Sequence, residues 1–143
     1  MVISTQHLAR CIETLETSLV SLARSSPDSI EYEVFRNAVV KGFELTLETS
    51  GKLLRKALKH YGGSPRDVDA LTYKDALRHA SKHGLLSDDE VKRWFAYRDN
   101  RNNTAHDYGV GFAEETLGLL PNFVTDARRL EAVLREKLGR VDA

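Results

Sequence analysis

The helical spacing of apolar residues constrains the fold of this chain more than any other feature. Between residues 5 and 23, apolar side chains recur at three- and four-residue steps, which places them on one face of a helix. This first stripe consists of Leu8, Cys11, Ile12, Leu15, Leu19 and Leu22. No segment alternates apolar and polar residues as a half-buried strand would. The pattern therefore predicts an all-α protein.

The same spacing, together with helix start and stop signals, predicts an up-and-down helical bundle of about five helices. Ser64 to Asp67 has the composition of a turn, and Gly84 is suited to a left-handed helix stop. Ser87 and Glu90 form a capping-box pattern ahead of an apolar run. We expect the helices at residues 5–23, 29–61, 72–83, 87–106 and 112–138.

Two residues interrupt these predicted helices. Pro121 lies inside the last helix, where the missing N–H should kink or divide it. Gly51 interrupts the apolar stripe of the long second helix, at a cost of about 1 kcal/mol relative to alanine. We therefore expect close packing or a bend of the helix at Gly51.

Length and composition favour one small domain spanning residues 1–143. The 21 Lys and Arg residues balance the 21 Asp and Glu residues, which argues against a sequence-blind nucleic-acid coat. Cys11 is the single cysteine, so an intrachain disulfide is excluded and a reducing compartment is favoured. No apolar run is long enough to cross a membrane, and residues 1–10 lack a signal-peptide pattern. We therefore expect a cytoplasmic protein with no membrane partner.

The apolar stripe breaks within the predicted helix 87–106. It begins with Val91, Trp94 and Phe95, but the same spacing then falls on mostly polar side chains. These later positions are Arg98, Arg101, Asn102, Ala105 and His106. A buried cation without a partner is costly. This face should therefore meet carboxylates, a second subunit or an anionic ligand.

Arg101 and His106 have the chemistry expected of a phosphodiester-cleaving site. Arginine forks onto phosphate oxygens, and histidine exchanges protons near neutral pH. The two residues lie five positions apart, about 140° around a helix, so packing two copies of the helix together would help them converge. This spacing favours a site shared by a homodimer. The alternative is an ordinary salt-bridged surface at a helix end.

Several neighbouring residues are candidates for supporting roles. Glu44 lies near the apolar stripe of the second helix, where it could be a semi-buried partner of Arg98 or Arg101. Asp99 could orient Arg98 or the cleft. His79 and His83 are four residues apart, but no third ligand accompanies them, so we expect no metal site.

A basic run on the second helix has two interpretations. The run consists of Lys52, Arg55, Lys56 and Lys59. It is either a solvated helix face or a rail for RNA phosphates or for an acidic protein surface. The composition alone does not separate these interpretations.

The segment 101–108, RNNTAHDY, resembles the hallmark R-x-x-x-x-H motif of the HEPN superfamily. Tyr108 gives the R-x-x-x-x-H-x-Y form found in HepT-like toxins, and Asn102 matches the polar residue that usually follows the arginine. The segment 42–48, GFELTLE, resembles the second-helix motif of the branch described as substrate-binding partners of minimal nucleotidyltransferases. Gly51 departs from that branch, which often has a bulky aromatic residue at this position.

This resemblance implies a fold, an activity and a partner. Members of the HEPN superfamily are helical bundles that pair as homodimers, and many are metal-independent endoribonucleases that need no cofactor. They act as toxins of toxin–antitoxin pairs and are neutralised by a nucleotidyltransferase-fold antitoxin. By this resemblance Arg101 binds the scissile RNA phosphate, His106 is the acid or base, and Asn102 supports them. Tyr108 becomes the AMPylation acceptor.

Two other functions stay open at this point. The chain could be a non-catalytic subunit that presents a nucleotide or another substrate to a separate nucleotidyltransferase. It could also be a structural helical adaptor, in which the Arg101 and His106 side chains contribute only to stability.

Overall fold

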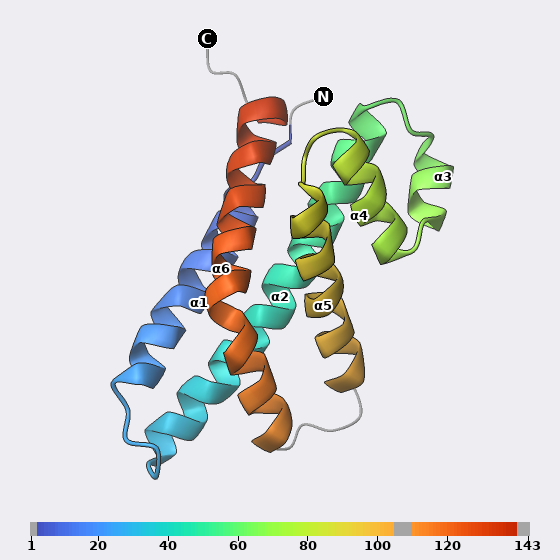
Figure 1. Ribbon diagram of the computed structural model, residues 1–143. Coiled ribbons are helices and arrows are strands. Elements are labelled where there is room, and N and C mark those ends of the chain that lie inside the picture. Colours follow the sequence, from blue (N-terminus) through green and yellow to red (C-terminus); the bar gives the residue numbers. More distant parts are fainter. Residues whose placement is uncertain (1–2, 105–109, 140–143) are drawn as a thin grey trace.

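The computed structural model describes the backbone of residues 3–104 and 110–139, and the side chains of residues 3–101 and 114–139. Six α-helices and no strand occur in these described ranges, which confirms the all-α prediction (Figure 1). The helices are α1 (Gln6–Ala23), α2 (Ile30–His60), α3 (Pro65–Ala70), α4 (Tyr73–Lys82), α5 (Asp88–Thr104) and α6 (Val110–Leu138). No helix in this part of the chain is both apolar and long enough to span a bilayer.

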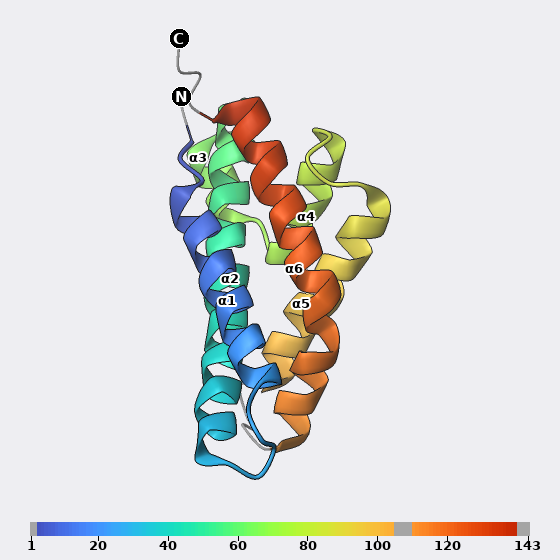
Figure 2. The same cartoon turned by 90° about the vertical axis from the view of Figure 1, so that its left-hand side faces the viewer.

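The three longest helices, α1, α2 and α6, pack against one another along the bundle (Figures 1 and 2). Helix α5 packs on α6 and α4, while α3 and α4 lie against α2. The end of α5 and the start of α6 lie at the end of the bundle opposite the two termini (Figure 1). At the terminal end, the Ile3 amide donates a 2.9 Å hydrogen bond to the Leu138 carbonyl.

The core is centred on four aromatic side chains from three helices. Phe43 of α2, Trp94 and Tyr97 of α5, and Phe123 of α6 are at most 1% exposed. The rings of Phe43 and Phe123 meet edge to face with centroids 4.7 Å apart, a favourable arrangement for aromatic pairs. Four residues of the predicted α1 stripe are buried, at Leu8, Ile12, Leu15 and Leu22, while Cys11 and Leu19 are half-buried at its edge.

Most of the predicted helix ends are confirmed. Ser87 Oγ accepts a hydrogen bond from the Glu90 amide, and Glu90 Oε1 accepts one from the Ser87 amide, both at 3.1 Å. This reciprocal capping box satisfies two backbone donors at the start of α5. Thr72 caps α4 by accepting from the Asp75 amide, and Gly84 follows α4 with φ of +75°.

The fold corrects two details of the prediction. Residues 64–67 do not form a simple turn: Pro65 begins helix α3, and Ser64 caps it by accepting from the Asp67 amide at 3.2 Å. Proline suits the first turn of a helix because that N–H would be unpaired anyway. Pro121 does not divide α6, which continues from Val110 to Leu138. Packing of α6 against its neighbouring helices outweighs the loss of one backbone hydrogen bond.

Gly51 is explained by close packing. A Cβ atom at this position would lie 2.7 Å from Cε2 of Tyr73, so the ring of Tyr73 occupies the space of the missing side chain. The Tyr73 hydroxyl lies 3.4 Å from the carbonyl oxygen of Leu47, to which it donates. An aromatic ring from α4 thus fills the position where the resembling branch often carries one on α2.

Candidate functional site

Helix α5 presents two different faces to its surroundings. The fully buried face contains Trp94, Tyr97 and Asn100, which point into the bundle. Phe95 and Arg98 are half-buried on an adjacent face that contacts α4. Of the polar residues in the predicted stripe, Arg98 and Arg101 are described, and both are half-buried and not within the deepest core.

Arg101 lies half-buried in the last turn of α5, where the sequence places the start of the motif. A cation in the last turn of a helix also complements the helix dipole. Residues His106 and Tyr108, and the side chain of Asn102, lie outside the described part of the structure. The convergence of Arg101 with His106 therefore stays a prediction.

A buried hydrogen bond joins the two helices that flank the motif. Asn100 Nδ2 donates to Thr116 Oγ1 of α6 at 3.1 Å, and the two residues are 7% and 0% exposed. Buried polar groups that pair with each other hold their helices in one register, since an unpaired group would be costly. The end of α5 that carries Arg101 is thereby fixed relative to α6.

Arg98 is held by an aromatic ring. Its guanidinium carbon lies 4.9 Å from the centre of the Tyr73 ring, a cation–π contact. Burial raises the pKa of the Tyr73 hydroxyl well above its usual range, although Arg98 and Arg55 oppose this shift. In the described side chains no carboxylate lies within 4.0 Å of the Arg98 guanidinium. The charge of Arg98 is therefore positioned by α4 without being neutralised by an acid there.

The two acids proposed for supporting roles, Asp99 and Glu44, differ in exposure and in their contacts. Asp99 is exposed and accepts from Lys74 of α4, with its two oxygens 3.0 and 3.2 Å from Nζ. Glu44 is half-buried on α2. The pairing of Glu44 with Arg98 or Arg101 stays a prediction, and Asp99 contributes a link between α4 and α5.

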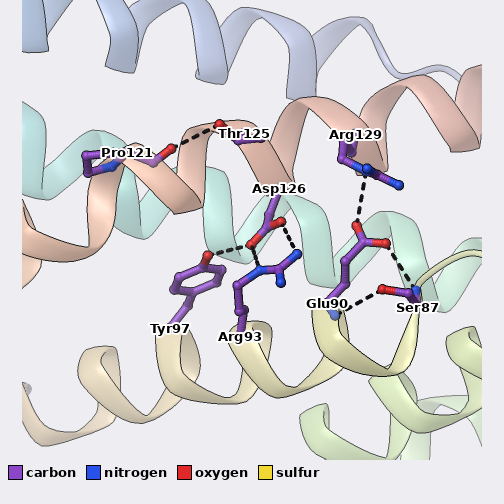
Figure 3. A network of polar contacts seen from close by, with 8 residues as sticks. All are labelled: Ser87, Glu90, Arg93, Tyr97, Pro121, Thr125, Asp126 and Arg129. Atoms are coloured by element: carbon purple, nitrogen blue, oxygen red, sulfur yellow. Dashed lines mark hydrogen bonds and ion pairs between the residues drawn. The ribbon is translucent and has the colours of Figure 1, made fainter.

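A buried carboxylate that the sequence analysis did not single out lies between α5 and α6 (Figure 3). Asp126 is 2% exposed and accepts two hydrogen bonds from Arg93, from Nε and Nη2, both at 2.8 Å. It also accepts from the Tyr97 hydroxyl at 2.5 Å. A sequence signal for this site did exist, because Asp126 interrupts the apolar stripe formed by Phe123, Ala127 and Leu130.

This cluster favours the neutral form of Tyr97 and the charged form of Arg93. Burial, with a further contribution from the hydrogen bond to Asp126, raises the pKa of the Tyr97 hydroxyl. The hydrogen bond to Asp126 raises the pKa of the Arg93 guanidinium. Tyr97 lies one helical turn before Arg101, so the cluster also fixes the segment of α5 from which the motif extends.

A second polar link between α5 and α6 lies nearer the start of α5. Glu90 Oε2 lies 3.6 Å from Nε of Arg129, while the same carboxylate closes the capping box with Ser87 (Figure 3). Arg129 is mostly exposed, so this ion pair contributes little to stability by itself. Together with the Asp126 cluster, it aligns α5 along α6.

The basic run of α2 is largely engaged in contacts within the chain. Lys52 pairs with Glu48 at 3.3 Å, and Lys59 pairs with Asp69 at 2.8 Å. Arg55 Nη1 donates to the Val68 carbonyl at 2.8 Å. The contacts of Lys59 and Arg55 attach α2 to α3, and together with the Lys52–Glu48 pair within α2 they favour a structural interpretation of the run. A role as an RNA rail stays a prediction.

Two histidines lie at the C-terminal end of α4. His79 is in the last turn, and His83, which follows the helix, stacks on Tyr61 with ring centroids 4.5 Å apart. No cluster of three or more potential His, Cys, Asp or Glu ligands occurs in the part of the chain that the structure describes.

The described part of the chain is a bundle of six helices, and Arg101, the first residue of the R-x-x-x-x-H sequence, lies in the last turn of its fifth helix. A family model described as "nucleotidyltransferase substrate binding protein like" matches residues 4–136. The chain belongs to this family. The finding confirms the resemblance that the segments 42–48 and 101–108 indicated.

Individual relatives agree with this assignment. A Haemophilus influenzae protein named probable ribonuclease HepT is 27% identical over 128 residues, covering 87% of this chain and 86% of that protein. A H. influenzae structure, described as the fold of a substrate binding domain of a nucleotidyltransferase, matches with a TM-score of 0.82 and 28% identity. The alignment covers 92% of this chain and 99% of that one.

Two further structures share the fold. A Thermus thermophilus protein matches with a TM-score of 0.71 and 26% identity, covering 90% of this chain and 98% of that chain. A chain from a structure described as a toxin–antitoxin with AMP-PNP matches with a TM-score of 0.64 over 89% of this chain and 96% of that one. At 11% identity, this last likeness concerns the fold alone.

Proposed function

We propose that this chain is the toxin of a type II toxin–antitoxin pair and acts as a metal-independent endoribonuclease. The observation that carries the proposal is the half-buried Arg101 in the last turn of α5, five residues before His106 and one turn after Arg98. The relative named probable ribonuclease HepT, which aligns over most of the chain, supports the same activity.

The proposed reaction is an attack of a ribose 2′-hydroxyl on the adjacent phosphate. The O2′–P bond forms and the P–O5′ bond breaks, which leaves a 2′,3′-cyclic phosphate and a 5′-hydroxyl. His106 removes the proton from the 2′-oxygen or donates one to the leaving 5′-oxygen, which is worth about 10² to 10⁴ in rate. Arg101 binds the non-bridging phosphate oxygens, and Arg98 and Asn102 support the phosphate-binding end of α5.

The proposed active unit is a homodimer. A second copy would bring a second Arg101 and His106 to the same cleft, which compensates for the angular separation of the two residues on one helix. The proposed regulator is a nucleotidyltransferase-fold antitoxin, and the proposed modification is transfer of AMP to Tyr108. The nucleotidyltransferase-related name of the family supports such a partner.

Growth of a bacterial host tests this proposal directly. Expression of the wild-type chain alone should arrest growth, and His106→Ala should restore it. Arg101→Gln should also relieve the arrest, whereas Arg10→Gln, an exposed change on α1, should not. Arrest that persists in both motif variants at equal protein levels would contradict the proposed site. Tyr108→Phe should stay toxic but should no longer be silenced by AMP transfer.

The family name favours a second candidate function, that of a non-catalytic nucleotide- or substrate-binding subunit of a two-component nucleotidyltransferase. A H. influenzae relative of known structure is described in those terms. In that case the purified chain would bind a nucleotide or a nucleotidyltransferase partner, leave RNA intact and permit growth when expressed alone. The growth assay with wild-type protein therefore separates the two candidates.

A further inference from the structure

Three cations gather over two aromatic rings where α4 meets α5. The guanidinium carbon of Arg78 and the Nζ of Lys74 lie 5.0 and 5.3 Å from the centre of the Phe95 ring. Arg98 lies over Tyr73 in the same way, at 4.9 Å. We call the surface formed by these five residues the α4–α5 seam.

The seam leads toward Arg101. Helices α4 and α5 run antiparallel, because Tyr73 and Lys74 at the start of α4 contact Arg98 and Asp99 near the end of α5. At the other end of the pair, Ser81 donates to Asp88 at 3.0 Å. From Phe95 to Arg101 the rise along α5 is about 9 Å. Arg98, the seam cation nearest to Arg101 in the sequence, precedes it by three residues, which is about 60° around the helix, so the positive charge of the seam comes within one helical turn of Arg101.

The charges of the seam are only partly balanced. Arg78 pairs with Asp75 at 2.7 Å, and Lys74 pairs with Asp99. The hydrogen bond from Arg78 lowers the pKa of Asp75. Side chains of both pairs are between 40% and 56% exposed, and such pairs exchange partners at little cost. Arg98 has no carboxylate near it among the described side chains.

The aromatic rings explain how cations can stay ordered here while their N–H groups remain usable. A cation–π contact uses the face of a guanidinium or one side of an ammonium, whereas phosphate binding uses the N–H edges. The rings therefore hold Lys74, Arg78 and Arg98 in place without consuming their donors. Pre-ordered donors lose less entropy when they bind an anion.

We propose that the α4–α5 seam binds the RNA backbone on one side of the cleavage site. Lys74, Arg78 and Arg98 contact successive phosphates through charge, so binding there is independent of base sequence. This inference rests on the proposed ribonuclease function, which it deepens by adding a substrate-binding surface outside the motif. The continuity of the seam with Arg101 favours RNA over an acidic protein as its ligand.

RNA affinity measured by fluorescence anisotropy tests the seam. The parent is the full chain with His106→Ala, which keeps the labelled RNA intact. The double variant Lys74→Gln/Arg78→Gln is compared with Arg10→Gln/Arg24→Gln, called the α1 variant, which removes one exposed charge from α1 and one from the residue that follows it. We expect about tenfold weaker binding in the seam variant and a salt dependence lower by about 1.4 log units per decade of salt. The α1 variant should match the parent.

RNA cleavage kinetics, measured on the same variants with His106 retained, provide a second test of the seam. The seam variant should raise the KM for RNA and leave kcat nearly unchanged, because the seam does not touch the reacting atoms. If the double variant folds poorly by circular dichroism, Arg78→Gln alone should still weaken binding about threefold.

The binding measurements distinguish failure of the seam proposal from failure of the ribonuclease proposal. A parent that binds RNA and a seam variant that binds it equally well would overturn the seam while leaving the ribonuclease proposal in place. Equal losses in the seam and α1 variants would show a general charge effect and would also overturn it. Normal RNA binding with lost neutralisation by the antitoxin would assign the seam to a protein partner instead. A parent that binds no RNA would overturn both proposals.

Discussion

Replacing Asp126 with asparagine should destabilise the fold by about 1 to 3 kcal/mol. The carboxylate is 3% exposed and accepts hydrogen bonds from Tyr97 and from two nitrogens of Arg93. A hydrogen bond to a charged group is worth about 1.5 to 3 kcal/mol, and the asparagine amide keeps only part of that value for Tyr97. The Arg93 side chain is 41% exposed, so solvent screening limits its share to about 0 to 1 kcal/mol.

Urea denaturation followed by circular dichroism measures this loss. The free energy of unfolding should fall with an unchanged m-value, since the fold stays the same. Glu48→Gln, which removes an exposed ion pair with Lys52, should change stability by less than about 0.5 kcal/mol. If Asp126→Asn costs no more than Glu48→Gln, the cluster does not hold α5 against α6 and the argument for its positioning role fails.

Three further perturbations test the packing, the capping and the ionisation inferred above. Gly51→Ala should lower stability by about 1 to 2 kcal/mol despite its better helix propensity, because its Cβ would lie 2.7 Å from the partly buried Tyr73 ring. Thermal melts test this against Gly118→Ala, where the added Cβ meets nothing within 4 Å, and equal melting temperatures would contradict the packing argument. Ser87→Ala should cost about 1 kcal/mol in chemical denaturation by removing one arm of the α5 capping box, and a neutral result would contradict the role of the cap. The pKa of the Tyr97 hydroxyl is higher in the folded than in the unfolded chain, so on raising the pH the unfolded chain loses this proton first. The free energy of unfolding is therefore unaffected by Tyr97 below about pH 10. Above that pH it falls by up to about 1.4 kcal/mol per pH unit. Denaturation between pH 9 and 11 should therefore show a shallower fall for Tyr97→Phe than for the wild type, and equal slopes would contradict the assigned shift.

Much of the helical architecture was predictable because its signals are local. The capping box of Ser87 and Glu90, the Thr72 cap and the stop at Gly84 each depend on residues within a few positions of one another. Helix α3 was missed because Ser64 and Pro65 suit both a turn and a helix start, and the choice depends on the following residues packing against α2.

The candidate site was predictable in its chemistry but not in its surroundings. The motif at Arg101 is visible in the sequence, as is the break in the apolar stripe at Arg98. The contact of Arg98 with Tyr73 joins residues 25 positions apart, and no periodicity in one helix indicates it. The hydrogen bond between Asp126 and Tyr97 was likewise not predictable. An acid within an apolar stripe indicates that it needs a buried partner, but the sequence does not identify that partner.

Gly51 shows how a departure from a family pattern can be compensated in three dimensions. The missing side chain on α2 is replaced by the ring of Tyr73 from α4, and the same ring supports Arg98. The sequence indicated close packing at Gly51, but the partner came from a segment more than 20 residues away. The Tyr73 ring thus both fills the space beside Gly51 and contacts the Arg98 guanidinium.

RNA cleavage by purified protein in EDTA tests the central claim most directly. The wild-type chain should cut RNA and leave 2′,3′-cyclic phosphate ends, because a guanidinium and an imidazole need no metal for this reaction. His106→Ala should cut at least about 100-fold more slowly while retaining the same fold by circular dichroism. Equal cleavage by the two proteins, or intact RNA with both, would contradict the assignment of Arg101 and His106 as a ribonuclease site.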